Sequence, residues 1–206
     1  NKRLSLFIIV LLLLIVTAGC QRKAGYLAST KQVSSKPDDL IVYEAQQRLW
    51  LTDSQGSFKQ ALTSKKIVAA QPSWSRDKKK IAFLYGNQKR LAFLDLTTKK
   101  VQLAKTEDNV ALANLSGPIA WFPDNQKVAY GQNELNGSQT IYYYHLKFRR
   151  PVVFWTKEFD ITSELNPAIS HDGKFIAFTW SYENETGFVQ ELWRLDTLSG
   201  QDLVKI

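Results

Sequence analysis

Short apolar segments separated by polar clusters run along the chain from about residue 41 onward. They are rich in aromatic and β-branched residues, as in IVY at 41–43, IAFLY at 81–85, LAFLDL at 91–96, IYYYHL at 141–146 and FIAFTW at 175–180. Clusters of Gly, Asn, Asp and Lys stand between them. Segments of this length and composition are typical of β-strands that are joined by turns. The pattern therefore predicts an all-β protein.

An internal repeat centred on an aspartate indicates how these strands are arranged. Its copies are QPSWSRDKKKIAF at 71–83, GPIAWFPDNQKVAY at 117–130 and NPAISHDGKFIAF at 166–178. The central residues Asp77, Asp124 and Asp172 lie 47 and 48 residues apart, and a second and a further short strand follow each copy. A half-copy precedes them, with RLWLTD at 48–53 and FKQALT at 58–63. A period of about 40–50 residues with four short strands predicts the blades of a β-propeller, whose faces are buried only when blades stack.

The repeat resembles the WD-like repeat of the TolB-type propellers, which is also found in the propeller domains of prolyl oligopeptidase-like peptidases. SWSRDKKKIAF, AWFPDNQKVAY and ISHDGKFIAF are similar to the Trp-Ser-Pro-Asp-Gly-Lys motif of that family. The resemblance extends over about residues 41–206 and implies the fold, since propellers with this motif have unrelated functions. We expect a partial blade at about 41–65 and further blades at about 66–112, 113–162 and 163–206.

The number of these blades predicts an incomplete propeller. TolB-type propellers usually close with six or more blades, whereas the chain supplies about four, so we expect an open arc. Four blades lie at the low end of what closes. The alternative is a true four-bladed ring in which residues 25–35 lend a strand to the final blade.

The aspartates Asp77, Asp124 and Asp172 fall where the first strand of each repeat turns into the second. An aspartate in a turn can accept hydrogen bonds from backbone groups two residues further on, so we interpret the three as structural. The next position favours a left-handed residue, which Asn125 and Gly173 suit. Lys78 would be strained there by about 1–2 kcal/mol, and we expect a different turn in that copy.

The first twenty residues have the layout of a bacterial export signal. A basic pair is followed by a mostly apolar run at 4–16, then by small residues and Cys20. This run is shorter than the about 20 residues that span a membrane. The segment 17–20 resembles the lipobox, apart from Thr17, where that family usually has Leu. The resemblance implies a signal peptide at 1–19 and lipidation of Cys20. An ordinary signal peptide with an incidental cysteine, a buried free cysteine and an uncleaved anchor are the alternatives.

Residues 20–40 are polar, which is typical of a flexible tether between a lipid anchor and a folded domain. In lipoproteins of diderm bacteria an Asp after the acylated cysteine favours the inner membrane, and this chain has Gln21. The resemblance thus implies the periplasmic face of the outer membrane. Cys20 is the only cysteine, so no intramolecular disulfide can form. Removal of residues 1–20 would lower the formal net charge from +8 to about +6, a basic excess that fits anionic lipid or glycan nearby and equally fits a generic soluble domain. By itself it does not indicate nucleic acid, which we do not expect as a partner.

Residue types that carry catalysis are sparse in the sequence. It has no G-x-S-x-G segment and two isolated histidines, His145 and His171, at repeat positions where other copies have Asp, Arg or Pro. Neither zinc-ligand spacing nor a glycine-rich phosphate loop is present. We expect no catalytic residue, no metal and no cofactor.

Partner-binding residues are predicted in the run KFRRPVVFW at 147–155. It places Lys147, Arg149 and Arg150 beside apolar residues, and Arg next to aromatic residues is favoured at interfaces. The alternative is a solvated turn before a core strand. We interpret the range 78–80 as a charged turn at the rim.

The tryptophans of the repeat strands are predicted to pack between blades. They are Trp50, Trp74, Trp121 and Trp193, of which we expect the second and third to be buried. Trp180 precedes the range 181–191, where we expect a long loop that offers a contact surface.

Together these features predict a cell-envelope lipoprotein with a non-catalytic propeller that binds or scaffolds a protein or glycan partner. One alternative is the propeller portion of a larger enzyme, such as a prolyl oligopeptidase-like peptidase with its catalytic domain beyond Ile206. Another is a lyase or hydrolase whose site lies on the propeller itself.

Overall fold

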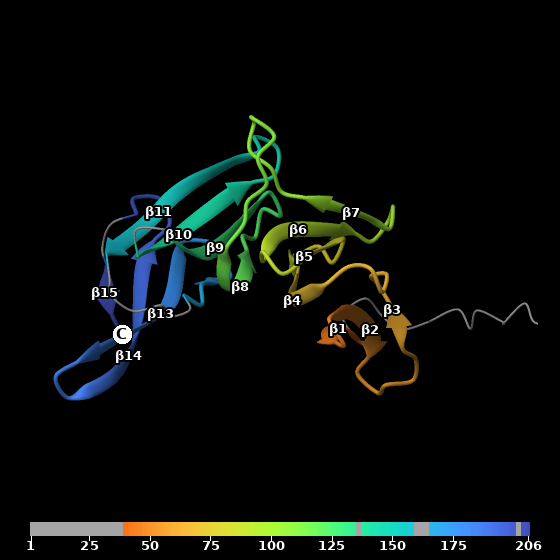
Figure 1. The fold of residues 1–206 in the computed structure, drawn as a ribbon, viewed down its shortest axis with the longest axis horizontal. Coiled ribbons are helices and arrows are strands. Elements are labelled where there is room, and N and C mark those ends of the chain that lie inside the picture. The colour runs from red at the N-terminus through yellow and green to blue at the C-terminus, as the bar shows by residue number, and fades with distance from the viewer. Residues whose placement is uncertain (1–38, 135–136, 159–164, 201–202) are drawn as a thin grey trace, which may run out of the picture. The chain divides into compact units, whose positions relative to one another are not determined.

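The computed structural model describes residues 39–134, 137–158, 165–200 and 203–206, all within one compact unit, Lys36–Ile206. These residues form four antiparallel sheets and no α-helix (Figure 1). In each sheet, the strands that follow one another in the chain pair with one another. The all-β prediction is confirmed.

Strand bounds follow the repeat. The first sheet holds β1 (Leu40–Ala45), β2 (Arg48–Asp53) and β3 (Gln60–Ala61). The second holds β4 (Ala69–Trp74), β5 (Lys80–Tyr85), β6 (Arg90–Asp95) and β7 (Lys100–Leu103). The third holds β8 (Leu115–Trp121), β9 (Lys127–Asn133), β10 (Ser138–His145) and β11 (Arg150–Glu158). The fourth holds β12 (Ala168–Ile169), β13 (Phe175–Asn184), β14 (Gly187–Asp196) and β15 (Val204–Lys205).

The first sheet corresponds to the second, third and fourth strands of a blade. Its β1–β2 hairpin pairs from Leu40–Asp53 to Ala45–Arg48, in the same way as β5–β6 pairs from Lys80–Asp95 to Tyr85–Arg90. Within the unit Lys36–Ile206 the sheets stand in chain order, and the first does not close onto the last (Figure 1). The described residues thus form an open propeller, as predicted.

Three hydrophobic clusters lie between neighbouring sheets. Phe83 faces the cluster shared with the first sheet, whereas Leu84, the next residue of β5, faces the cluster shared with the third sheet. Ile176 and Phe178 of β13 pack in the same way against the third sheet. Because a central sheet is buried on both faces, its strands are continuously apolar and do not alternate with polar residues. Blade stacking therefore explains runs such as IAFLY.

Two prolines of the repeat lie in β-bulges. The pairing of β4 with β5 shifts between Ala70 and Ser73, and that of β8 with β9 shifts between Ser116 and Ala120. Gln71 (φ 49°) and Gly117 (φ 72°) are the first residues of these bulges, and a proline follows each. A bulge accommodates proline because the local ladder is already interrupted. The bulge of β8 is one residue longer, which explains the differing distance from proline to aspartate.

The aspartate turns have the same conformation in the three full repeats. Lys78 (φ 57°), Asn125 (φ 55°) and Gly173 (φ 75°) are all left-handed, so the expectation of a different turn at Lys78 is wrong. The carboxylate of Asp77 accepts hydrogen bonds from the Ser75 hydroxyl (2.7 Å) and the Lys79 amide (3.1 Å). These bonds fix the turn strongly enough to hold a lysine in a strained conformation.

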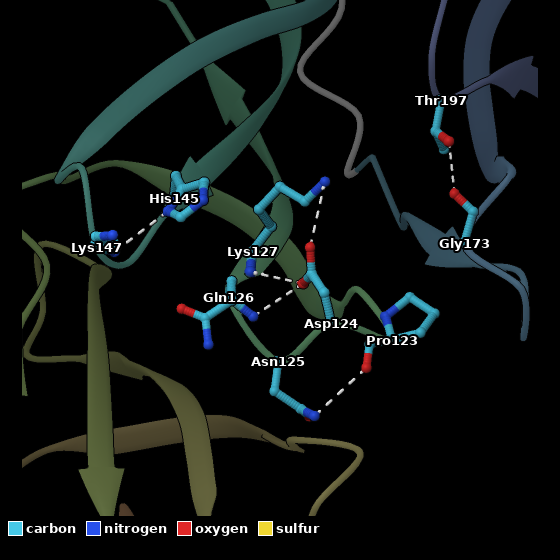
Figure 2. A network of polar contacts seen from close by, with 9 residues as sticks. All are labelled: Pro123, Asp124, Asn125, Gln126, Lys127, His145, Lys147, Gly173 and Thr197. Carbon is cyan, nitrogen blue, oxygen red and sulfur yellow. Dashed lines mark hydrogen bonds and ion pairs between the residues drawn. The ribbon is translucent and has the colours of Figure 1, made fainter.

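Figure 2 shows the corresponding contacts of Asp124. One carboxylate oxygen accepts hydrogen bonds from the backbone amides of Gln126 (2.9 Å) and Lys127 (3.2 Å), and the other lies 3.3 Å from the Lys127 ammonium. The side-chain oxygen of Asn125 accepts a hydrogen bond of 3.1 Å from the backbone amide of Asp77. This bond joins the turns of the second and third sheets. Burial raises the pKa of Asp77, but the bonds from Ser75 and Lys79 outweigh it and the pKa is lowered.

Two expectations about side chains need correction. Trp121 is buried, but Trp74 is only half-buried. Lys79 is exposed, whereas Lys78 and Lys80 are half-buried. The ammonium of Lys78 lies 5.4 Å from the centroid of the Trp74 ring. Trp74 is less buried than Trp121 because it lies on the face of β4 toward the three-stranded first sheet, whereas Trp121 packs against a complete blade.

The range 181–191 is not a long loop. β13 continues to Asn184 and β14 begins at Gly187, and their backbones pair up to the turn. The antiparallel register that begins at Phe175 and Asp196 continues without a shift to Asn184 and Gly187. Trp180 is buried in the cluster between the third and fourth sheets.

Candidate functional site

The predicted partner-binding residues lie at the β10–β11 turn and are exposed. Lys147 and Arg149 are in the turn and Arg150 begins β11, an edge strand of the third sheet. The ring of Phe148, which is 56% exposed, lies 4.3 Å from that of His145. β11 is the edge strand of its sheet, and its Phe154 and Trp155 pack against the buried cluster shared with the fourth sheet, so the alternative of a solvated turn before a core strand also fits.

A pocket of about 240 Å³ opens beside this turn, between the second and third sheets. Its floor is aromatic: Phe93 and Tyr144 are buried and lie nearly parallel, with ring centroids 6.1 Å apart. Three cationic side chains line it, from Lys80, Lys100 and Arg149. We call this site the basic pocket. It brings Arg149 together with two lysines of another blade, whereas Lys147 and Arg150 are not among its lining residues.

Strand register places the lysines in one row. Lys80 at the start of β5 pairs with Asp95 at the end of β6, and Asp95 pairs with Lys100 at the start of β7. The β5, β6 and β7 ends meet where the β4–β5 and β6–β7 turns emerge, because the strands alternate in direction. The neighbouring blade adds Arg149 from its β10–β11 turn. The sequence predicted a charged turn at the rim for the range 78–80. The strand register shows in addition that Lys80 lines a pocket.

The single carboxylate of the basic pocket is already engaged. Asp95 accepts hydrogen bonds from the amides of Thr97 (3.0 Å) and Thr98 (2.8 Å) and from the Thr98 hydroxyl (3.1 Å). The Thr98 amide bond, followed by the other turn bonds and the charge of Lys80, lowers the pKa of Asp95 below its ordinary value. Asp95 therefore stays ionised and holds the β6–β7 turn, while the cations leave the pocket net positive.

Tyr144 adds no negative charge to the floor. Burial raises its pKa, and the Arg149 guanidinium opposes that shift only in part. Its hydroxyl donates a hydrogen bond of 3.0 Å to the Lys105 carbonyl in the connection after β7. A neutral aromatic floor under three cations can hold an anionic group through charge-assisted hydrogen bonds.

The other residues singled out in the sequence have structural positions or lie outside the described residues. Asp77, Asp124 and Asp172 are in the turns described above, and hydrogen bonds from Ser170 and the Lys174 amide lower the pKa of Asp172. His145 ends β10 and His171 is exposed in a turn. Cys20 and the segments 1–19 and 20–38 lie outside the described residues.

Neither a metal cluster nor a membrane-spanning helix is found in the described part of the chain. No three His, Cys, Asp or Glu side chains there are close enough to hold a metal ion. No helix there is long and apolar enough to cross a membrane.

The stacked antiparallel sheets and their aspartate turns define a β-propeller module, and comparison with solved structures gives its type. TolB from Acinetobacter baumannii is similar with a TM-score of 0.62 and 22% identity, over 81% of this chain and 40% of that protein. A putative TolB from Agrobacterium tumefaciens matches with a TM-score of 0.59 and 16% identity, over 83% and 59%. The fold is thus that of the TolB-type propellers.

The similarity also extends to a peptidase. A structure from a study of two prolyl endopeptidases matches with a TM-score of 0.56 and 17% identity, over 77% of this chain and 25% of that one. The chain therefore spans less than two thirds of the length of each of these three proteins. No protein family model and no curated protein matches the sequence. At these identities the likeness concerns the fold alone.

Proposed function

We propose that this chain is a non-catalytic binding module of the cell envelope, which recognises an acidic group on a protein or glycan partner through the basic pocket. The convergence of Lys80, Lys100 and Arg149 over an aromatic floor carries the proposal. Its volume of about 240 Å³ is below the about 300–1,000 Å³ of sites for whole drug-sized ligands. It suits one carboxylate-bearing group of a larger partner.

A charge-reversal experiment tests the basic pocket. Fluorescently labelled hexaglutamate is titrated with the full chain, and binding is followed by anisotropy at low and at physiological salt. We expect saturable binding that weakens as salt rises, since the contacts are ionic. The double variant Lys100→Glu/Arg149→Glu should bind about tenfold more weakly or worse, because hydrogen bonds to charged groups contribute about 1.5–3 kcal/mol each.

The matched control is Lys65→Glu/Lys66→Glu. It changes the net charge by the same amount on exposed residues outside the pocket. If both double variants lose affinity equally, general charge attraction accounts for the binding and the assignment of the pocket fails.

We further propose that Cys20 is lipidated and tethers the propeller to a membrane, on the order of basic, apolar and small residues before it. Cys20→Ser should move the protein from the membrane fraction to the soluble fraction, while Gln21→Ala should leave it in the membrane fraction. The measurement is fractionation with immunoblotting, together with mass spectrometry of the mature N-terminus. A mature wild-type protein that starts elsewhere and bears no acyl chain contradicts the proposal.

A further inference from the structure

Two adjoining pockets lie around the β5–β6 turn, at the strand ends opposite the basic pocket. The larger, of about 360 Å³, is lined by this turn, by the start of β8 and by Asn133 at the end of β9. The smaller, of about 190 Å³, extends to Tyr85 and Arg90. Asn87 and Gln88 line both. Because the two pockets share these residues, we treat them together and call them the amide groove.

Carboxamide side chains from three separate elements meet in the amide groove. Asn87 and Gln88 come from the β5–β6 turn, Asn114 precedes β8, and Asn133 ends β9. Its lining residues include the cations Lys89 and Arg90 and no Asp or Glu. Each carboxamide both donates and accepts hydrogen bonds, so the groove offers both functions along its length.

Backbone hydrogen bonds between blades fix the walls of the groove. The Asn114 amide donates to the Gln88 carbonyl (2.9 Å), and the Leu115 amide donates to the Lys89 carbonyl (3.2 Å). These bonds join the second and third sheets at the groove itself. They fix the backbone that carries Asn114 beside the β5–β6 turn, while the exposed side chains of Asn87 and Asn114 can turn toward a ligand.

Several polar side chains of the groove keep bonding capacity. The side chains of Asn87 and Asn114 make no hydrogen bond with the described residues. Ser116 is only 4% exposed, and its hydroxyl has no partner in the described part of the chain. Gln88 in contrast accepts a hydrogen bond from Arg90, which partly satisfies that cation. That hydroxyl oxygen of Ser116 is itself buried, so the bonding groups that the groove presents to a ligand are the carboxamides.

We infer that the amide groove binds a neutral oligosaccharide. Sugar hydroxyls donate and accept in the same way as the carboxamides that line it, and Tyr85 offers an aromatic surface in the adjoining pocket. A peptide added as a strand would need an open sheet edge. β5 and β6 are interior strands of their sheet, and the backbone amides of Asn114 and Leu115 are already bonded. This site is separate from the basic pocket and does not depend on the proposed function.

Titration of the full chain with two neutral trisaccharides tests the groove. Triacetylchitotriose and maltotriose are added separately, and binding is measured by isothermal titration calorimetry. At least one of them should bind with a one-to-one stoichiometry. Asn87→Ala/Asn114→Gly should weaken that binding about tenfold or more, and the glycine preserves the left-handed backbone of Asn114 (φ 60°). Gln126→Ala, which removes an exposed carboxamide at the opposite strand ends, should bind as the wild type does.

The unfolding midpoint of Asn87→Ala/Asn114→Gly separates binding from folding. Both side chains are exposed and make no hydrogen bond with the described residues, so the midpoint should stay close to that of the wild type while the trisaccharide affinity falls. The inference is overturned if neither trisaccharide binds at millimolar concentration. It is also overturned if Asn87→Ala/Asn114→Gly binds as tightly as Gln126→Ala. If hexaglutamate does not bind while a trisaccharide does, the proposed function of the basic pocket is contradicted and the inference about the amide groove stands.

Discussion

Replacing Trp121 with alanine is expected to lower the free energy of unfolding by about 3–5 kcal/mol, the range for truncation of a large buried aromatic side chain. Trp121 is 3% exposed and lies in the cluster between the second and third sheets. Its indole N–H donates a hydrogen bond of 3.0 Å to the Ser73 carbonyl of the neighbouring blade. Its ring meets that of Phe93 edge-on, at 5.7 Å between centroids. The substitution therefore removes both packing and an inter-blade hydrogen bond.

Trp74 at the equivalent repeat position is the matched control. It is half-buried, and its indole N–H has no partner among the described residues. Trp74→Ala should therefore cost clearly less than Trp121→Ala. Urea unfolding followed by circular dichroism, with unchanged m-values, gives the change in the free energy of unfolding of each variant relative to the wild type. Equal losses for the two variants would show that burial and the Ser73 contact do not set the cost.

Gly117→Ala is expected to destabilise the protein by about 2–5 kcal/mol. Gly117 has a φ of 72°, where an alanine is strained by about 1–2 kcal/mol. A Cβ atom there would lie 2.4 Å from the Leu165 carbonyl oxygen and 2.8 Å from the Asn166 side-chain oxygen. The Leu165 oxygen belongs to the backbone and cannot turn away, so overpacking destabilises the variant by about 1–3 kcal/mol in addition to the backbone strain. Gly117 thus permits the close approach of the third sheet to the chain that enters the fourth.

Gln71 provides the comparison at the first residue of the other bulge. It is left-handed (φ 49°) without being a glycine, and its buried side-chain oxygen has no partner in the described chain. Gln71→Gly relieves strain but makes the unfolded chain more flexible, so stability should stay within about 1 kcal/mol of the wild type. Chemical unfolding of both variants checks the pair. A Gly117→Ala protein as stable as the wild type would mean that the bulge or Leu165 moves aside at little cost.

The position of a residue in the repeat did not determine its burial. Trp74 and Trp121 occupy the same position of successive copies, yet only Trp121 is buried. The repeat predicts which way a side chain points, because strand residues alternate between faces. The depth of the blade stacked on that face is a property of the neighbouring sheet, and the first sheet has only three strands in the described residues.

The aspartate turns show how local hydrogen bonds override a residue preference. Propensity disfavoured a left-handed lysine, and the structure has one at Lys78. The bonds of Ser75 and Lys79 to Asp77 recur in the copy around Asp172, and together they compensate the strain. A repeat can thus keep its turn while its glycine is lost.

The sequence by itself determined the all-β class, the propeller repeat and the turn positions of Asp77, Asp124 and Asp172. Each depends on local chemistry and on a period that the chain repeats. Only the tertiary structure showed that Lys80, Lys100 and Arg149 line one pocket and that Asn87 and Asn114 line one groove. Both sites form where one blade stacks on the next. Which side chains meet there depends on sheet register and blade packing, which join residues far apart in the chain.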